Sequence, residues 1–451
     1  MTAASPPGNA GGFRWTYVFG ALGGMLFGYD TGIIAGAILF IRQDLNLSPL
    51  AEGLVVSSLL LGALVGAAAS GYLSDRLGRR RLLLLAGAVF TVGALGAALS
   101  PDANVLMGFR LLLGLAVGVA SVMVPLYLAE MAPTRIRGAL TSLNQLMIAV
   151  GIFIAYLTAF LLSGAGAWRV MLGLAAVPSL LMLAGMWFQD ESPRWLVVHG
   201  HDDEARAVLA RTRTPDEVEH EIAEMHRAEE ADRMSLGELL RARWLRRNLV
   251  FAGVLAVFQQ LIGINTIVYY APTILKAAGF GNSAAIFNSV GLGMLSIIMT
   301  VVAARVVDRV GRKPLLLWGL VGMVASMAVL GVVFFSAALD TIAGKAIAVV
   351  CLAIFKAAFS LSWGPMLGVV LPELLPLRAR GTVMGGAIFL NWGTNFLVSL
   401  LFPVLLVAGA GAVFEIFAGA GVLAFVLTAW LFRETTGRSL EELELAQRAA
   451  G

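Results

Sequence analysis

Two ionisable residues, Asp30 and Arg110, stand inside long apolar stretches of the chain. A charge at the depth of a hydrocarbon core costs at least ~2.5 kcal/mol, so such residues normally have a partner and a function. A carboxylate beside a guanidinium can take up and release a proton as its surroundings change. The two residue types therefore indicate proton chemistry inside a membrane, and a static ion pair that only orders two helices is the alternative.

Uncharged amides form a second polar set within apolar stretches. Each amide offers two donors and an acceptor oxygen, which suits a neutral ligand rich in hydroxyl groups. Trp363 and Trp392 could offer flat apolar faces to the same ligand. Hydrogen bonding between helices is the alternative role for the amides. The amides are Gln145, Gln259, Gln260, Asn265 and Asn391.

Composition indicates an integral membrane protein. Of the 451 residues, 59% are hydrophobic and 13% are charged, whereas soluble domains hold about 45–50% apolar and about 25% charged residues. Cys351 is the single cysteine, which excludes an intramolecular disulfide. The first residues lack the pattern of a signal peptide and are expected to form a short polar tail. The net charge of +4 does not indicate nucleic acid binding, because topology places the arginines of membrane proteins.

Twelve stretches are long and apolar enough to cross a bilayer, which takes about 20 residues per helix. An even number of crossings puts both ends of the chain on one side of the membrane. The expected spans are 16–41, 53–73, 82–100, 105–129, 138–162, 168–188, 248–275, 284–306, 314–337, 343–371, 382–406 and 411–432.

Basic residues predict which side that is. The two tails and the loops that follow the even-numbered spans hold 26 of the 32 lysines and arginines, and the opposite loops hold four. Basic loops stay in the cytoplasm. We therefore expect a multi-pass protein of the cell membrane with both termini cytoplasmic.

The one long polar segment, about 190–247, contains all four histidines. Thr214, Pro215 and Glu217 fit the start of a helix, and SLGE at 235–238 fits a second capping box. Short cytoplasmic helices are predicted here, with a solvated linker as the alternative. His199 and His201 have no cysteine nearby, so no metal site is predicted.

The two halves of the chain repeat each other. YLSDRLGRRRLLL at 72–84 matches RVVDRVGRKPLLL at 305–317, and EMAPTRIRG at 130–138 matches ELLPLRARG at 373–381. GYDT at 28–31 matches GINT at 263–266, which makes Asp30 and Asn265 counterparts. Duplicated six-helix halves are typical of transporters. The predicted division is a tail (1–15), a first half (16–189), a helical linker (190–247), a second half (248–432) and a tail (433–451).

Asp30 and Arg110 are expected at similar depths in the membrane. Asp30 follows Arg14 by 16 residues, and Arg110 precedes Glu130 by 20. At 1.5 Å per residue, both lie ~24–30 Å from the cytoplasmic surface. The pair is then within reach in the outer half of the membrane.

The motifs resemble the major facilitator superfamily, and more narrowly its sugar porter family, over nearly the whole chain. D-R-x-G-R-[RK], present after the second and eighth spans, is similar to the superfamily signature. Three further motifs are similar to those of sugar porters: ESPRWL at 191–196, QQLIGINTIVYYAP at 259–272 and RETTGRSLEE at 433–442. The last motif departs from the family pattern at Arg433 and Thr436.

The resemblance implies an all-α membrane fold of twelve helices in two six-helix halves, which move a monosaccharide with a proton by alternating access. It implies proton coupling by Asp30 and Arg110 and sugar contact by the amide set. It also implies a salt-bridge latch that holds the inner gate closed. Topology alone would explain the arginines of that latch but not its acids. The latch residues are Asp75, Arg79, Glu130, Arg137, Glu191, Arg194, Asp308, Arg312, Glu373, Arg380 and Glu434.

Three residues stay unexplained by the pattern. Lys356 lies three residues from the repeat counterpart of Arg110, with Asn265 as a partner or the outer surface as the destination of its amine. Gly368 and Ser296 occupy positions where sugar porters often carry Trp and Asn, which leaves the identity of the sugar open.

The sequence thus predicts a proton-coupled symporter for a monosaccharide, a glucose-like hexose, that works as a monomer in the bilayer without a cofactor. The alternatives are a facilitative sugar uniporter, a polyol, inositol or pentose symporter, and a non-transporting sugar sensor. An enzyme is not expected, because the chain shows no nucleophile constellation and no phosphate-binding loop.

Overall fold

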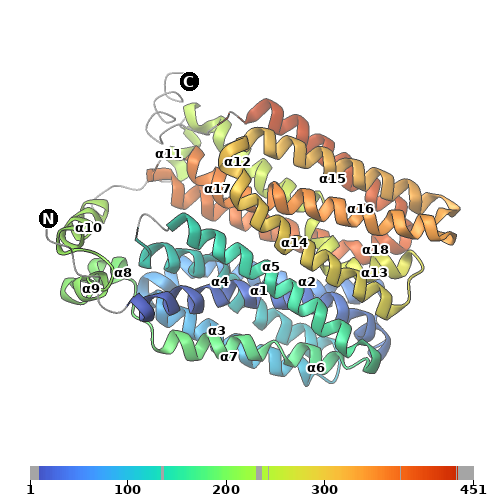
Figure 1. Ribbon diagram of the computed structural model, residues 1–451, viewed down its shortest axis with the longest axis horizontal. Helices are drawn as coiled ribbons and strands as arrows, with labels where there is room; N and C mark the ends of the chain where they lie inside the picture. The colour runs from blue at the N-terminus through green and yellow to red at the C-terminus, as the bar shows by residue number, and fades with distance from the viewer. Residues whose placement is uncertain are drawn as a thin grey trace.

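The computed structural model describes residues 10–133, 137–229, 236–241, 243–375, 377–432 and 434, and three of the expected latch side chains, those of Arg137, Asp308 and Arg380, lie outside the description. The described chain folds into two helical bundles that lie side by side, with shorter helices at one end (Figure 1). The first bundle holds α1 (Ala10–Asp44), α2 (Pro49–Leu77), α3 (Arg79–Ala98), α4 (Ala103–Met131), α5 (Arg137–Leu162), α6 (Trp168–Gly173) and α7 (Ala176–Trp187).

The second bundle follows four short linker helices. These are α8 (Pro193–Val198), α9 (Asp202–Leu209), α10 (Pro215–Glu229) and α11 (Leu236–Arg241). As expected, α10 begins at Pro215, and Glu217 Oε2 accepts a hydrogen bond from the Thr214 N–H at 2.8 Å; Ser235 lies outside the described residues. The second bundle holds α12 (Arg243–Leu261), α13 (Ile264–Ala277), α14 (Asn282–Val310), α15 (Arg312–Phe335), α16 (Ile342–Leu361), α17 (Trp363–Leu374) and α18 (Leu377–Leu431).

Within the described residues, 11 helical segments are long and apolar enough to span a membrane. The difference from the twelve expected spans lies in α18, whose 55 residues include a non-helical conformation at Gly409. Asn248 Nδ2 donates to the Leu374 carbonyl, just before α18 begins, and Arg247 Nε donates to the Leu431 carbonyl, where it ends. Because adjacent residues hold both ends of α18, this helix turns back near Gly409 and supplies two crossings.

Two spans of the second bundle are broken near their middle. The first breaks between α12 and α13 at Gly263, which has a φ of 92° that a side chain would disfavour. The second breaks between α16 and α17 at Ser362. Such breaks free backbone groups from the helical pattern, and transporters use them to build binding sites at mid-membrane depth.

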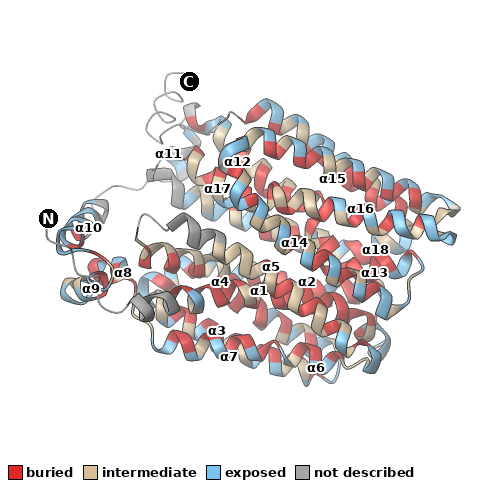
Figure 2. Cartoon of the chain, viewed as in Figure 1, coloured by how far each residue is buried: buried red, intermediate tan, exposed pale blue. Residues whose placement is uncertain are grey.

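Many residues on the outer faces of both bundles are exposed (Figure 2), and large apolar residues are among them. Trp318 and Trp430 are each 73% exposed, and Phe335 is 66% exposed. In water such surfaces would be unfavourable, but lipid chains cover them at no cost. The polar linker helices stand apart from this belt.

The two bundles touch each other mainly away from the linker helices. We call the end of the molecule with α8–α11 the linker end and the opposite end the far end (Figure 1). Near the far end, Tyr156 of α5 donates to the Val268 carbonyl at 2.6 Å, and Ser163 Oγ lies 3.2 Å from Ser283 Oγ. Gly53 packs so closely on α18 that an added Cβ would lie 2.2 Å from the Leu400 carbonyl oxygen.

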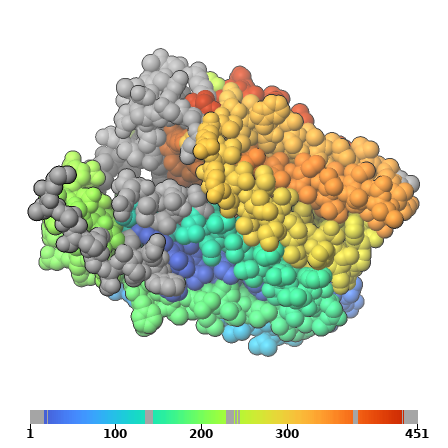
Figure 3. All heavy atoms as spheres, in the orientation of Figure 1, coloured from blue at the N-terminus to red at the C-terminus, as the bar shows by residue number. Residues whose placement is uncertain are grey.

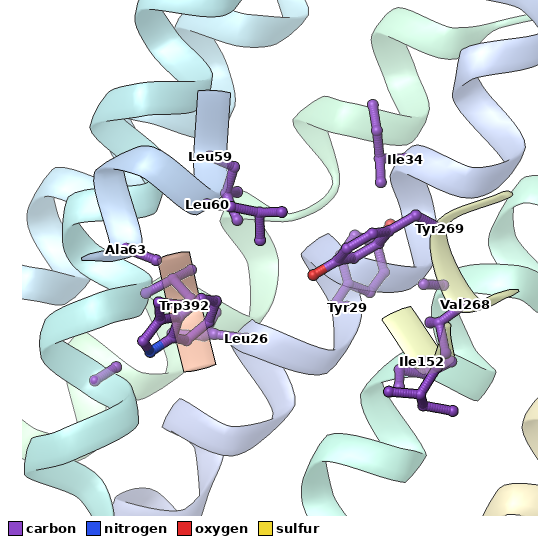
Figure 4. Close-up of a cluster of buried hydrophobic side chains, with 14 of the residues drawn as sticks. Leu26, Tyr29, Ile34, Leu59, Leu60, Ala63, Ile152, Val268, Tyr269 and Trp392 are labelled. Carbon is purple, nitrogen blue, oxygen red and sulfur yellow. The ribbon is translucent and has the colours of Figure 1, made fainter. Parts of the chain in front are cut away.

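A buried apolar cluster continues this interface toward the middle of the molecule (Figure 4). It joins α1, α2 and α5 of the first bundle to α13 and α18 of the second. Phe27 and Trp392 meet edge to face across the interface, with ring centroids 5.6 Å apart. Figure 3 shows the two bundles pressed together toward the far end. The structure is therefore closed at the far end, where both halves supply packed backbone and side chains.

The linker helices α8 and α10 are attached to the first bundle. Trp195 Nε1 donates to the Asp75 carbonyl at 3.1 Å. Arg213 is 8% exposed, and its Nη1 donates to the Met131 carbonyl at the end of α4 at 3.0 Å. Glu221 of α10 accepts from Arg213 Nε at 3.2 Å. These bonds hold α8 and α10 against the linker end of the first bundle.

Candidate functional site

Asp30 and Arg110 meet in the interior of the first bundle. Asp30 Oδ1 lies 3.7 Å from Arg110 Nη1, and each residue is 1% exposed. Neither Asp30 Oδ2 nor Arg110 Nη1 has a hydrogen-bond partner among the described residues. The contact is thus an ion pair without a direct hydrogen bond, in a place where water cannot compete.

Arg110 has a second set of partners that does not depend on Asp30. Its Nε donates to the Val55 carbonyl at 2.7 Å, and its Nη2 donates to the Val56 carbonyl at 3.4 Å. Both carbonyls belong to α2, which packs closely on α4. The guanidinium therefore stays anchored on one side while the side facing Asp30 is free to respond to the charge of the carboxylate.

The amides of the second bundle gather where its spans are broken. Gln259 and Gln260 lie at the end of α12, and Asn265 lies at the start of α13, just beyond Gly263. Asn391 reaches them from α18. A continuous helix would not place Gln260 and Asn265 in this way, so the break at Gly263 creates the cluster.

Hydrogen bonds join the four amides into one chain. Asn265 Nδ2 donates to Gln260 Oε1 at 2.8 Å, and Gln260 Nε2 donates to Asn391 Oδ1 at 3.1 Å. Asn391 Nδ2 in turn donates to Gln259 Oε1 at 2.9 Å, and Gln259 Nε2 donates to the Trp363 carbonyl at 2.8 Å. We call these four residues the amide cluster. Groups that bond to one another here can exchange these bonds for a ligand's hydroxyls at little cost.

Gln145 stands apart from the amide cluster. It lies on α5 of the first bundle and is half-buried. Its side chain makes no hydrogen bond to the amide cluster among the described residues. In this conformation the polar residues expected to contact one ligand therefore belong to two bundles.

The two tryptophans differ in their surroundings. Trp363 is fully buried, and its indole N–H donates to the Leu316 carbonyl of α15 at 3.1 Å. Trp392 lies next to Asn391 and faces Phe27 of the other bundle. Of the two rings, Trp392 lies at the interface between the bundles, whereas Trp363 is packed inside the second bundle.

Charged residues at the linker end form matching ion pairs in the two bundles. In the first bundle, Arg79 Nε lies 3.0 Å from Glu130 Oε2, and Arg79 Nη1 lies 3.7 Å from Asp75 Oδ1. In the second, Arg312 Nη2 lies 3.0 Å from Glu373 Oε1. The repeated sequence motifs thus fold into repeated contacts.

Two further acids of the set cap helices. Glu191 Oε1 accepts from the Arg79 and Arg80 N–H groups at 2.8 and 3.0 Å, at the start of α3. Glu434 accepts from the Arg312 and Lys313 N–H groups at 3.0 and 2.9 Å, at the start of α15. A carboxylate is favourable at a helix N-terminus because the free N–H groups there carry partial positive charge. The sequence indicated the acids but not this role.

The ion pairs described at the linker end stay within one bundle. Arg194 is exposed and has no ion pair among the described residues. The side chains of Arg137, Asp308 and Arg380 lie outside the description. The expected latch between the bundles is therefore not assembled from the described side chains in this conformation.

Comparison with known proteins shows which family has this sequence and fold. The family described as "Sugar (and other) transporter" matches residues 16–446. The glucose transporter GlcP of Staphylococcus epidermidis is 46% identical over 434 residues, which cover 96% of each chain. The galactose-proton symporter of Escherichia coli K12 is 40% identical over 428 residues, which cover 94% of this chain and 92% of the relative.

Solved structures agree in fold. The proton:xylose symporter XylE, bound to 6-bromo-6-deoxy-D-glucose, superposes with a TM-score of 0.80 at 31% identity and covers 97% of this chain and 100% of its own. The partially occluded inward-open form of the E. coli xylose transporter superposes with a TM-score of 0.84 at 29% identity, over 95% of this chain and 99% of its own. The match spans the whole helical fold rather than one motif, and transporters rather than enzymes make up these relatives. This chain is a multi-pass membrane transporter of the sugar porter family within the major facilitator superfamily.

Proposed function

We propose that the protein is a monosaccharide–proton symporter of the cell membrane, with a glucose-like hexose as its substrate. The observation that carries the proposal is the buried Asp30–Arg110 ion pair, because a titratable acid with a loosely held cation is what a proton step requires. The names of the glucose and galactose relatives support a hexose. The amide cluster supplies donors and acceptors that suit its hydroxyl groups.

We further propose that the linker end faces the cytoplasm. The arginine-rich loops lie at that end, and basic loops stay inside. Because the bundles are closed at the far end, the structure then corresponds to an inward-facing state. The TM-score of 0.84 with an inward-open form supports this assignment.

The transport cycle follows from these two proposals. In the outward-facing state, a proton from outside neutralises Asp30 and weakens its hold on Arg110. Sugar binds between the amide cluster and the first bundle, and the far end closes through contacts such as Tyr156 with the Val268 carbonyl. Sugar and proton leave toward the cytoplasm, and the ion pair forms again.

Uptake into proteoliposomes tests the proposal. Labelled hexoses, pentoses and polyols are offered with and without an inward proton gradient. Concentration of a hexose only when the gradient is present supports symport. Equal hexose levels inside and outside in both conditions would instead identify a facilitative uniporter.

We expect Gln260→Ala and Asn265→Ala to weaken sugar binding several-fold to tenfold. Each variant removes an amide of the cluster, and one hydrogen bond is worth ~0.5–1.5 kcal/mol net. Isothermal titration with the transported sugar measures the change, and Asn288→Ala, which alters an exposed amide of α14, is the matched control. Unchanged affinity in both variants would remove this cluster from the binding site.

The charged residues of the linker end are proposed to latch the bundles together in the outward-facing state. Each bundle presents an acid and an arginine already held in place, so closing the linker end would bring charges of both signs together. Glu373→Gln should weaken the latch while sugar binding survives. A cysteine introduced at the linker end should then react faster with a thiol reagent than the same cysteine in the parent protein. Glu224→Gln, on the exposed face of α10, is the control. Unaltered labelling in Glu373→Gln would exclude this residue from the latch.

A further inference from the structure

Among the described residues of the second bundle, Lys356 is a buried cation without a charged partner. Lys356 lies in α16 and is 6% exposed. Within the described part of the chain, its amine makes no hydrogen bond and no ion pair. With 6% exposure the side chain stays inside the bundle, and no hydrogen bond joins its amine to the Asn265 side chain. A buried ammonium without a counter-charge is costly, so an intramembrane lysine in this state indicates a function.

The internal repeat explains why the partner is missing. Asp30 corresponds to Asn265, and Arg110 corresponds to position 353, one helical turn from Lys356. The first bundle thus pairs an acid of its first helix with a cation of its fourth. The second bundle keeps the cation but has an amide where the acid would be.

Lys356 lies near the broken part of its span. It precedes the last residue of α16, Leu361, by five residues, which is ~8 Å along the helix. Just beyond the break at Ser362, the Trp363 carbonyl accepts a hydrogen bond from Gln259, and Asn265 is the second residue of α13, just beyond the break at Gly263. Since α13 packs against α16, Lys356 and the amide cluster lie in neighbouring segments of the second bundle.

Two buried hydroxyl groups lie one helical turn from Lys356 along α16. Ser360, one turn along the same face, has its Oγ 3.2 Å from Ser296 Oγ of α14, and both serines are buried. This pair of hydroxyl groups offers further hydrogen-bond partners to a polar ligand group beside Lys356. Toward the linker end, beyond the break at Ser362, Gly368 in α17 has no atom within 4 Å of the place where a side chain would begin.

We propose that the carrier accepts monosaccharide acids, with Lys356 binding the carboxylate and the amide cluster binding the hydroxyl groups. This inference rests on the proposed sugar transport and names a substrate class for the same site. The ligand supplies the acid that the repeat lacks at position 265. A carboxylate moved together with one proton carries no net charge, whereas a neutral hexose with one proton carries one positive charge.

Binding to the purified protein tests the proposal with three ligands: D-glucuronate, its neutral methyl ester and D-glucose. We expect the wild type to bind glucuronate at least ~10-fold more tightly than the ester, because a charge-assisted hydrogen bond is worth ~1.5–3 kcal/mol. Lys356→Met should reduce this preference to within about twofold and leave the ester and glucose unchanged, and Lys356→Arg should restore part of it. Lys345→Met is the control, since this second lysine of α16 bonds to the Gly279 carbonyl at the far end.

Transport currents give a second readout in wild-type proteoliposomes on a solid-supported membrane. Glucose should produce an inward positive current, and glucuronate should take up protons, seen with a pH dye, with little or no current. No preference for the acid over its ester, or an equal preference in Lys356→Met, would overturn the inference. Proton-coupled glucose transport in that case would leave the proposed function standing, whereas failure to bind any of the three ligands would overturn both.

Discussion

Asp30→Asn is expected to abolish the accumulation of sugar against its gradient and the proton flux that sugar induces. The amide has nearly the shape of the carboxylic acid but cannot titrate, so the protein loses the group that the proton would neutralise. Sugar binding and counterflow exchange should persist, since neither requires net proton movement. Uptake with a proton gradient, sugar-induced pH change and counterflow are measured on the same proteoliposomes.

Because Arg110 has hydrogen-bond partners other than Asp30, the Asp30→Asn variant can distinguish proton coupling from a purely structural ion pair. Even without Asp30, the guanidinium donates to the Val55 and Val56 carbonyls, so the variant should fold. Asp44→Asn is the matched control: it makes the same change in α1, at an exposed acid that pairs with Arg169. If the ion pair only orders helices, all transport modes should fall together. A folded Asp30→Asn protein that still concentrates sugar would show that another residue couples the proton.

Gly53→Trp should hold the carrier open at the far end and stop every mode of transport, counterflow included. Any Cβ at this position would lie 2.2 Å from the Leu400 carbonyl oxygen, well inside van der Waals contact, and a backbone atom of α18 cannot move without moving the helix. The bundles could then no longer close as they do here. Sugar binding from the far end should survive, because the amide cluster is distant from Gly53.

Distances between spin labels show whether the far end of the Gly53→Trp variant stays open. Labels at Leu50 of α2 and Val407 of α18, both exposed near the far end, should move apart in Gly53→Trp relative to the parent. The native Cys351 is buried and should not compete for the label. Gly71→Trp is the control, because the same helix has open space at that glycine. Wild-type label distances together with normal counterflow in Gly53→Trp would refute the role of this contact.

Hydropathy predicted most of the fold because the bilayer demands long apolar helices. It did not predict how helices are interrupted, since an interruption depends on one or two residues in an otherwise apolar run. Gly263 and Ser362 break two spans, and nothing in the average hydropathy of those spans marks them. Conversely, the two segments that the sequence predicted at the end of the chain are joined without a loop, because α18 turns back at the single non-helical residue Gly409.

In the functional site, too, the sequence predicts some features and not others. The proximity of Asp30 and Arg110 was within reach of sequence reasoning, because helix rise fixes depth and buried charges seek partners. The carbonyl partners of Arg110 were not, since backbone acceptors leave no trace in residue type. The resemblance to sugar porters indicated the acids Glu191 and Glu434, but their position at helix N-termini depends on the packing of segments more than 110 residues apart.

The attachment of α8 and α10 to the first bundle has a practical consequence for imaging this small carrier. Arg213 and Trp195 bond to backbone carbonyls of α4 and of α2, so these helices should travel with the first bundle as one rigid body. An antibody fragment raised against the exposed face of α9 and α10 would then bind every state of the cycle equally. In electron cryo-microscopy it would serve as an alignment marker fixed to one bundle, against which the swing of the other is recorded directly.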